Sequence, residues 1–268
     1  MSLRITTNVE AFNAYRNLNA TQSALSKSME RLSSGYRINR GADDAAGLGI
    51  SESMRASIRG LAQAQRNIQD GVSVVQTAEG NLNQVHSMLQ RVRELAVQYN
   101  NGSLSTEGRS AIQTEVNQLA SEIDRVFESA KFNGVALLTG SSSMTFQVGA
   151  NDGETISVTL GAVTGAGTSS WVSFSTTDSS MISKIDTAIS AISARRSTLG
   201  AVQNRLENSL AVQAAYQENL TAAESRIRDV DMAEEMVKFT KSQILAQAGQ
   251  SMLAQANAAP QQVLQLLQ

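Results

Sequence analysis

The chain has 268 residues, 22 Lys and Arg against 24 Asp and Glu, and a formal net charge of −2, so no strong overall field indicates a nucleic-acid or anionic-membrane partner. Cysteine is absent and His86 is the one histidine, which excludes disulfides, thiolate zinc sites, cysteine nucleophiles and a histidine-based metal cluster. The single proline suits very long helices, and no apolar run reaches the roughly 18 residues needed to span a bilayer.

The first element follows the N-terminus, where apolar side chains recur at helical spacing. The stripe is marked by Val9, Phe12, Tyr15, Leu18, Gln22, Leu25, Met29 and Leu32. It is too thin to be stable alone, so we expect it to need a partner. A stretch with four glycines, residues 35–49, then interrupts the helical pattern.

Two long stretches with apolar steps of three and four residues give the strongest signal. The first runs from Met54 to Tyr99 and the second from Ile182 to Val230. A helix over 54–99 would be about 69 Å long at 1.5 Å per residue, and its narrow stripe must be covered by other helices. We therefore expect these two stretches to pack against each other.

Between the two long stretches the spacing of the apolar residues changes. Residues 107–130 predict a third helix, with Ser105 placed as its N-cap. Alternating apolar residues on either side of an Asn-Asp-Gly at 151–153 then predict a β-hairpin. Residues 161–180, rich in Gly, Ser and Thr, indicate a loop or a weak strand.

The last element is a looser stripe between Met232 and Ala256. Together the elements predict a mainly α fold, in which N- and C-terminal parts form an antiparallel coiled-coil bundle of long helices. The small β-hairpin region is expected at the distal end of this bundle.

No constellation of residues predicts catalysis, a cofactor or a metal. Asp43 and Asp44 fit residues at a helix N-terminus better than paired catalytic carboxylates. Residues 151–154 are turn chemistry without the remaining ligands of a calcium loop, and the glycines at 161–167 lack the Lys of a phosphate loop. His86 is expected to be structural, so the sequence predicts that the protein is not an enzyme.

Several ordered blocks resemble the bacterial flagellin family. They are SMERLSSGYRINRGADDAAGLGISE (28–52), LQRVRELAVQ (89–98), EIDRVFESAKFNGVALL (122–138), FQVGANDGE (146–154), LGAVQNRLENSL (199–210), ESRIRDVDMAEEM (224–236) and ILAQAGQSMLAQANAAPQQVLQLL (244–267). Long matches in the family's order outweigh any single short motif.

The resemblance implies a structural subunit that polymerises with copies of itself into the flagellar filament for motility. It implies that residues 1–44 and 230–268 form a terminal helical domain that is disordered in the monomer and lines the filament channel. Residues 45–138 and 181–229 would form the rod-like core, and 139–180 a short hairpin and variable insert, whose Ser and Thr could be O-glycosylated or simply form a loop.

Partners are implied as well. Family members leave the cell through the flagellar export apparatus with an export chaperone, and contact cap and hook-junction proteins. The start of the chain has no apolar core of a signal peptide, so we expect an extracellular flagellar location reached by that route. No nucleic acid and no membrane insertion are expected.

The resemblance also marks a recognition site. In flagellins bound by the animal Toll-like receptor for flagellin, the contact residues match Arg91, Leu95 and Glu115 of this sequence. Arg91 and Leu95 are four residues apart and are expected to share one helical face. Two other functions remain as alternatives: a hook–filament junction protein of the same architecture, and a membrane-active helical protein. The second should carry bulky apolar and Lys/Arg-rich faces, which these Ala- and Gln-rich helices lack.

Overall fold

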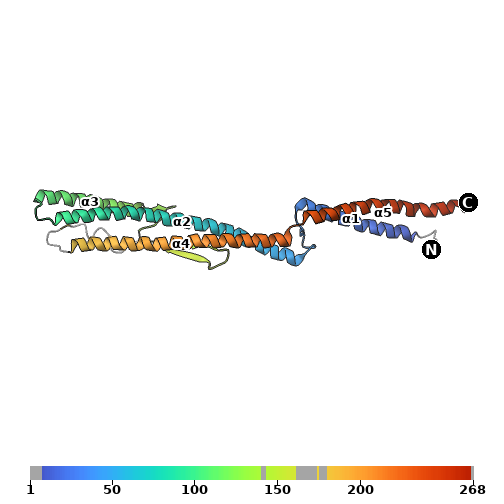
Figure 1. Cartoon of the computed structure of the whole chain (residues 1–268), viewed down its shortest axis with the longest axis horizontal. Helices are drawn as coiled ribbons and strands as arrows, with labels where there is room; N and C mark the ends of the chain where they lie inside the picture. The colour runs from blue at the N-terminus through green and yellow to red at the C-terminus, as the bar shows by residue number, and fades with distance from the viewer. Residues whose placement is uncertain (1–7, 140–142, 161–173, 175–179, 267–268) are drawn as a thin grey trace. The chain divides into compact units, whose positions relative to one another are not determined.

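The computed structural model describes residues 8–139, 143–160, 174 and 180–266, with side chains as far as residue 258. The loop expected at 161–180 lies almost wholly outside these residues, whereas the hairpin part of the 139–180 insert is described. The elements are α1 (Val9–Ser34), α2 (Ala45–Tyr99), α3 (Thr106–Ser129), β1 (Lys131–Phe132), β2 (Val135–Ala136), β3 (Ser143–Gln147), β4 (Thr155–Thr159), α4 (Met181–Arg228) and α5 (Met232–Leu266) (Figure 1). This confirms the predicted mainly α fold.

The chain forms two compact units. Unit 1 consists of residues 1–56 and 219–268, and unit 2 of residues 57–218. Both units therefore combine segments from the two halves of the sequence, as the paired long stretches predicted. Helices α2 and α4 contribute residues to both units.

In unit 2, α2 and α4 pack antiparallel. Three contacts fix the register: Gln65 Nε2 donates to Gln217 Oε1 at 2.7 Å, Arg196 lies 3.5 Å from Glu79, and Arg93 lies 2.6 Å from Asp186. From one contact to the next, the residue number rises in α2 and falls by a similar amount in α4, as expected for antiparallel helices. The predicted pairing of the two stretches is confirmed.

The start of α2 differs from the prediction. The helix begins at Ala45, nine residues before Met54, although Gly47 and Gly49 lie in its first turns. Asp44 caps it, since its Oδ1 accepts a hydrogen bond from Gly47 N at 2.8 Å. An N-cap of this kind contributes about 1 kcal/mol, which offsets much of the helical cost of a glycine.

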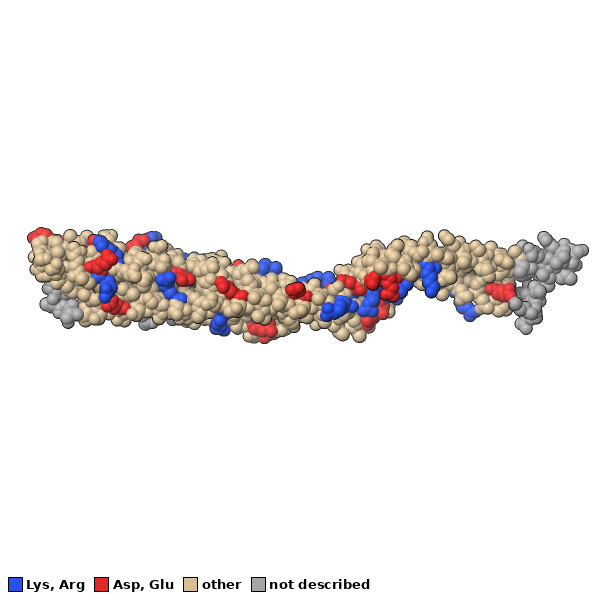
Figure 2. All heavy atoms as spheres, in the orientation of Figure 1, with Lys and Arg blue, Asp and Glu red and all other residues tan. Residues whose placement is uncertain are grey.

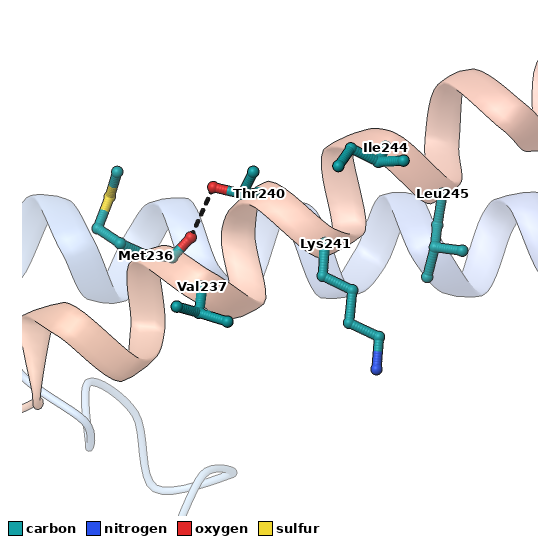
Figure 3. Close-up of a pocket in the computed structure, with 6 residues that line it drawn as sticks. All are labelled: Met236, Val237, Thr240, Lys241, Ile244 and Leu245. Carbon is teal, nitrogen blue, oxygen red and sulfur yellow. Dashed lines mark hydrogen bonds between the residues drawn. The ribbon is translucent and has the colours of Figure 1, made fainter.

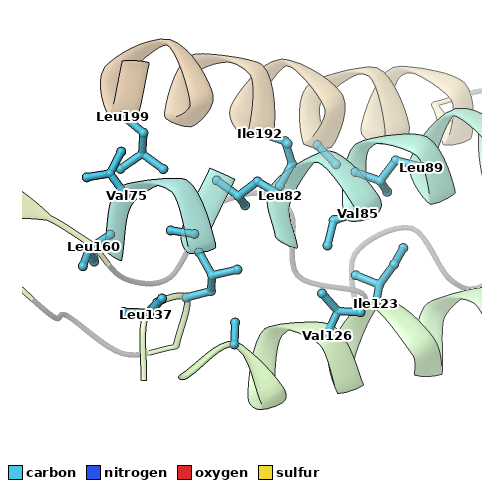
Figure 4. Close-up of a cluster of buried hydrophobic side chains, with 14 of the residues drawn as sticks. Val75, Leu82, Val85, Leu89, Ile123, Val126, Leu137, Leu160, Ile192 and Leu199 are labelled. Carbon is cyan, nitrogen blue, oxygen red and sulfur yellow. The ribbon is translucent and has the colours of Figure 1, made fainter. Parts of the chain in front are cut away.

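The core of unit 2 is a continuous layer of aliphatic side chains. Figure 4 shows α4 residues Ile192 and Leu199 above α2 and α3 residues Ile123 and Val126 below it, with Leu82 and other α2 side chains between them. Leu82, Ile123, Ile192 and Leu199 are fully buried. Helix α2 is thus covered on two sides, so its apolar surface is wider than the single stripe that faces α4.

Helix α3 begins where predicted. Ser105 is its N-cap, and Ser105 Oγ accepts from Gly108 N at 3.1 Å. After α3, a two-residue turn at Asn133 and Gly134 joins β1 to β2, both residues having positive φ (47° and 79°). This short hairpin was not predicted, because two-residue strands have no readable alternation.

The predicted larger hairpin is present. Strands β3 and β4 pair antiparallel from Ser143–Thr159 to Gln147–Thr155, on either side of the Asn-Asp-Gly turn. Its expected place at the distal end is wrong: Phe146 lies against Gly71 of α2, and Ala150 against Gly60. The reason is α3, whose 24 residues return the chain by about 36 Å along α2 before the hairpin begins.

Unit 1 is built on an antiparallel pair of α1 and α5. Asn8 Nδ2 donates to the carbonyl of Ala256 at 2.7 Å, Leu18 faces Gly249, and Ser28 Oγ donates to Glu235 Oε1 at 2.6 Å. Ser28 and Glu235 are 6% and 3% exposed, so a polar contact occupies the most buried part of this seam. Arg31 Nη1 lies 3.7 Å from the same carboxylate.

The links between helices in unit 1 are held by hydrogen bonds and ion pairs. Gly35 ends α1 in the left-handed conformation (φ 75°), and its carbonyl accepts from Val230 N at 3.0 Å. The Arg228 guanidinium stacks over Tyr36 at 4.9 Å and pairs with Glu52 at 2.6 Å. Asp231 caps α5, accepting from the N–H groups that follow it. Each of these contacts joins residues of the two sequence halves or caps a helix, so unit 1 depends on both ends of the chain.

Candidate functional site

The first candidate surface is the outer face of the α1–α5 pair. Large apolar side chains that are roughly half or more exposed occupy it: Val9 (53%), Phe12 (67%), Tyr15 (55%), Met29 (55%), Met236 (48%), Val237 (69%), Ile244 (60%), Leu245 (49%) and Met252 (61%). A groove on α5 is lined by Met236, Val237, Thr240, Lys241, Ile244 and Leu245. In Figure 3, Val237, Lys241 and Leu245 project to the same side of α5, and Thr240 donates back to the Met236 carbonyl at 2.8 Å.

The two units differ sharply in how many of their apolar side chains are buried. Among the described residues of unit 1, only Ile38 and Ala246 are buried hydrophobic side chains, whereas unit 2 buries a continuous cluster. Monomeric proteins seldom leave contiguous apolar surface exposed, and where they do it commonly marks an interaction site. The α1–α5 surface is therefore a candidate for binding apolar partners.

The second candidate surface is on α2 and α3, where the sequence predicted a recognition site. Arg91 donates to Glu115 Oε1 from Nε at 3.1 Å and from Nη2 at 3.0 Å, and to Glu94 Oε2 from Nη1 at 3.0 Å. Glu94 and Glu115 raise the pKa of Arg91 above its ordinary value by accepting these hydrogen bonds. The structure thus brings Arg91 and Glu115 together on an accessible face, with side chains 51% and 46% exposed.

Leu95 lies differently from Arg91. It is 1% exposed and belongs to the apolar cluster that α3 covers. The expectation that Arg91 and Leu95 present one common face therefore does not describe the free chain: Arg91 is at the rim of the α2–α3 contact and Leu95 is inside it. Glu94 was missed by the sequence reasoning, although its position three residues after Arg91 is a usual spacing for a helical ion pair.

Charges are mixed along the surface. On the face shown in Figure 2, basic and acidic side chains lie next to one another and no large area carries a single sign. Within the described residues, opposite charges also pair directly, as Arg125 does with Glu122 at 2.5 Å and Lys27 with Asp43 at 2.7 Å. This face offers no basic patch of the kind that nucleic-acid binding requires.

The remaining candidate features are His86, a metal site and a membrane-spanning helix. His86 Nε2 lies 3.1 Å from Gln90 Nε2, one turn along α2. Among the residues that the structure describes, no group of three His, Cys, Asp or Glu could hold a metal ion. Within that same part of the chain, no helix combines the length and apolarity needed to cross a membrane.

Comparisons with known proteins agree with this architecture. The model for the bacterial flagellin N-terminal helical region matches residues 5–143, and that for the C-terminal helical region matches residues 182–267. The chain is 52% identical to a flagellin of Halalkalibacterium halodurans, over 97% of this chain and 98% of the relative. It is 46% identical to a flagellin of Bacillus subtilis, over 99% of this chain and 100% of the relative.

Solved structures show the same fold. The crystal structure of Bacillus cereus flagellin has a TM-score of 0.51 and 29% identity, and covers 55% of this chain and 87% of that one. A putative flagellar hook-associated protein from Vibrio parahaemolyticus has a TM-score of 0.56 over 70% of this chain and 100% of that one, but at 17% identity it shows the fold alone. With two family models over most of its length and full-length relatives at 46–52% identity, the chain belongs to the bacterial flagellin family and is a structural subunit of the flagellar filament, not an enzyme.

Proposed function

We propose that the chain polymerises through the α1–α5 pair of unit 1, while unit 2 is the preformed body of each subunit. The observation that carries the proposal is the contrast in burial. Unit 2 has its own aliphatic core, whereas α1 and α5 leave side chains such as Phe12 and Val237 67% and 69% exposed. Neighbouring subunits would cover this surface in the filament.

On this basis, residues 1–44 and 230–268 form the inner, channel-lining part of the filament. Residues 45–138 and 181–229 form the surrounding tube, and 139–180 an outer insert. The thin α1–α5 seam would not recover the ordering entropy of its residues, about 1–2 kcal/mol each for the backbone. The terminal segments therefore order only during assembly, which keeps the free subunit from polymerising early.

The same exposed face explains why partners are needed before assembly. We propose that an export chaperone covers α5, that the chain is secreted through the flagellar export apparatus, and that cap and hook-junction proteins receive it outside the cell. Exposed apolar side chains such as Val237 and Ile244 would otherwise promote aggregation in the cytoplasm.

Removal of residues 230–268 tests the proposed assembly. The truncated protein should remain helical and melt cooperatively, because the unit 2 core is intact, but it should not form filaments even with seeds. Replacement of the same residues by a Gly/Ser linker of equal length controls for chain length. Filaments from either variant, seen by electron microscopy, would disprove the proposal.

We further propose that Arg91 and Glu115 form a surface recognised by the animal Toll-like receptor for flagellin. Both side chains are about half exposed, and the Arg91 guanidinium is held in place by two carboxylates. Leu95 would act from beneath, by holding α2 against α3 so that the pair keeps its geometry.

Arg91→Ala tests this proposal in a receptor-reporter assay. Loss of a hot-spot arginine costs about 2 kcal/mol or more, which corresponds to a roughly 30-fold higher half-maximal dose. Arg125→Ala is the matched control, since Arg125 is 65% exposed and pairs with a glutamate on α3. Equal potency of the two variants, with unchanged helicity, would remove Arg91 from the site.

A further inference from the structure

The turn between α2 and α3 contains an Asn-Gly pair in an unusual setting. Asn101, Gly102 and Ser103 are all exposed. Asn101 Oδ1 accepts from Ser103 N at 3.2 Å, and the Asn101 carbonyl accepts from Leu104 N at 3.3 Å. The first contact folds the Asn101 side chain over the peptide bond that joins it to Gly102.

The Asn101–Gly102 pair supplies the two groups that react in asparagine deamidation. The Gly102 nitrogen attacks the side-chain carbonyl carbon of Asn101, loses its proton, and forms a new C–N bond. The bond from that carbon to the side-chain nitrogen breaks, and ammonia leaves with the proton. Water then opens the resulting succinimide to aspartate or isoaspartate. Gly102 N–H has no hydrogen-bond acceptor among the described residues, so ring closure breaks no existing contact of the nucleophile.

A second Asn-Gly pair provides a contrast within the same chain. Asn133 and Gly134 form the turn between β1 and β2, and Asn133 has a φ of 47°. Closure of a succinimide ring requires rotation about ψ of the asparagine, which the paired β1–β2 turn holds in place. Formation of the ring would require opening of the hairpin, including the Phe132–Val135 pair. The fold therefore protects Asn133 and leaves Asn101 reactive.

The surroundings of Asn101 also favour the product. Arg109 Nη2 donates to the Asn101 carbonyl at 3.3 Å, and its guanidinium lies 5.9 Å from the Tyr99 ring centre. Arg109 Nε is buried without a hydrogen-bond partner, and Arg109 has no ion-pair partner among the described residues. An aspartate at position 101 could keep the bond from Ser103 N with one oxygen and offer the other to Arg109.

We infer that Asn101–Gly102 is a site of spontaneous deamidation in the folded protein, and that Arg109 captures the carboxylate it produces. The modification adds a negative charge to the α2–α3 turn and supplies the anion that Arg109 lacks. As a slow reaction that needs only water, it would mark the age of each subunit.

Peptide mass spectrometry of the full-length protein, held at mildly alkaline pH and 37 °C, tests the first half of the inference. Asn101 should lose its amide about tenfold or more faster than Asn133, because only the second reaction requires local opening. Gly102→Ala should slow the reaction at Asn101 about tenfold, since the added Cβ restricts the backbone. This variant is expected to fold, because a Cβ at Gly102 meets nothing within 4 Å and its φ is not positive. In denaturant, Asn101 and Asn133 should react at similar rates.

Two outcomes would overturn this half: an Asn133 rate in the folded protein equal to that of Asn101, or an Asn101 that keeps its amide as long as the Gly102→Ala protein does. Thermal melts test the capture by Arg109. Asn101→Asp should raise Tm by about 1–3 °C in the wild-type background and not in Arg109→Ala, as expected for a partly exposed ion pair. An equal change of Tm in both backgrounds would show that Arg109 does not bind the new carboxylate.

Discussion

Replacement of Val237 by threonine should weaken filament assembly without weakening the subunit. Val237 lies on α5 and is 69% exposed, so little of its surface is buried before assembly. Valine and threonine have nearly the same shape and similar helix propensities, so α5 itself should be unaffected. The substitution therefore isolates the apolar character of one side chain.

The magnitude follows from the exposed fraction. Full burial of a valine side chain stabilises by about 1.5–3 kcal/mol, and roughly two thirds of that remains available for assembly at Val237. Loss of about 1–2 kcal/mol per subunit should raise the critical concentration roughly 5- to 30-fold. Sedimentation of seeded reactions over a concentration series measures this value directly.

Val135→Thr is a matched control, because it makes the same chemical change at a 44% exposed position in β2 of unit 2. Threonine is also favoured in strands, so the short hairpin should tolerate it. The critical concentration of Val135→Thr should stay within about twofold of the wild-type value. The corresponding change in free energy is below the roughly 0.5 kcal/mol that most surface substitutions do not exceed. If Val237→Thr assembles like the wild type, or if both variants are impaired alike, the reasoning about the α1–α5 surface is refuted.

Three further outcomes are expected. Leu89→Ala, at a fully buried position in the unit 2 core, should lower the free energy of unfolding by about 2–5 kcal/mol in thermal or denaturant melts, and an effect below 1 kcal/mol would contradict the described core. Lys27 is the main cause that lowers the pKa of Asp43 from 3.8 to about 2, so the ion pair stabilises the fold above pH 3.8 and is lost as the pH falls through 2. Because Lys27 lies on α1, Asp43→Asn should lower the melting temperature of filaments near neutral pH, with a difference that shrinks as the pH falls towards 2; a difference that stays constant in acid would show another cause. Hydrogen exchange of the dilute monomer should be fast in α1 and α5 and slow across Leu82–Val92 and Ile185–Leu206, whereas strong protection of α1 and α5 would show that the ends fold before assembly.

Much of the fold could be predicted because its main elements are long and periodic. The steps of three and four residues from Met54 to Tyr99 fit a long helix and do not fit a strand, and Ser105 is a readable cap. The start of α2 was predicted only in part: Asp44 was expected at a helix N-terminus and does cap α2, but Gly47 and Gly49 suggested a break in the helix after it. The β1–β2 turn has a sequence sign, Asn133–Gly134, but no alternating run surrounds it to mark the strands.

The candidate recognition site shows a different limit. Sequence spacing placed Arg91 and Leu95 on one side of a helix, which is correct within α2 taken alone. Whether such a residue is exposed depends on what packs against the helix, and α3 returns over this side of α2. As a result Arg91 remains at the surface and Leu95 is 1% exposed.

The polar contact in the α1–α5 seam has a consequence for how the two helices find their alignment. Small and flexible side chains dominate these helices, so apolar packing alone would tolerate several offsets of similar energy. A shift of α5 by one turn would carry the Glu235 carboxylate away from Ser28 and Arg31 and leave it with Lys238 of its own helix, 3.8 Å away. The loss of one hydrogen bond and one ion pair at a buried carboxylate costs more than a small loss of packing. The buried Glu235 carboxylate can thus fix the alignment of α1 and α5, which apolar packing alone would leave undetermined.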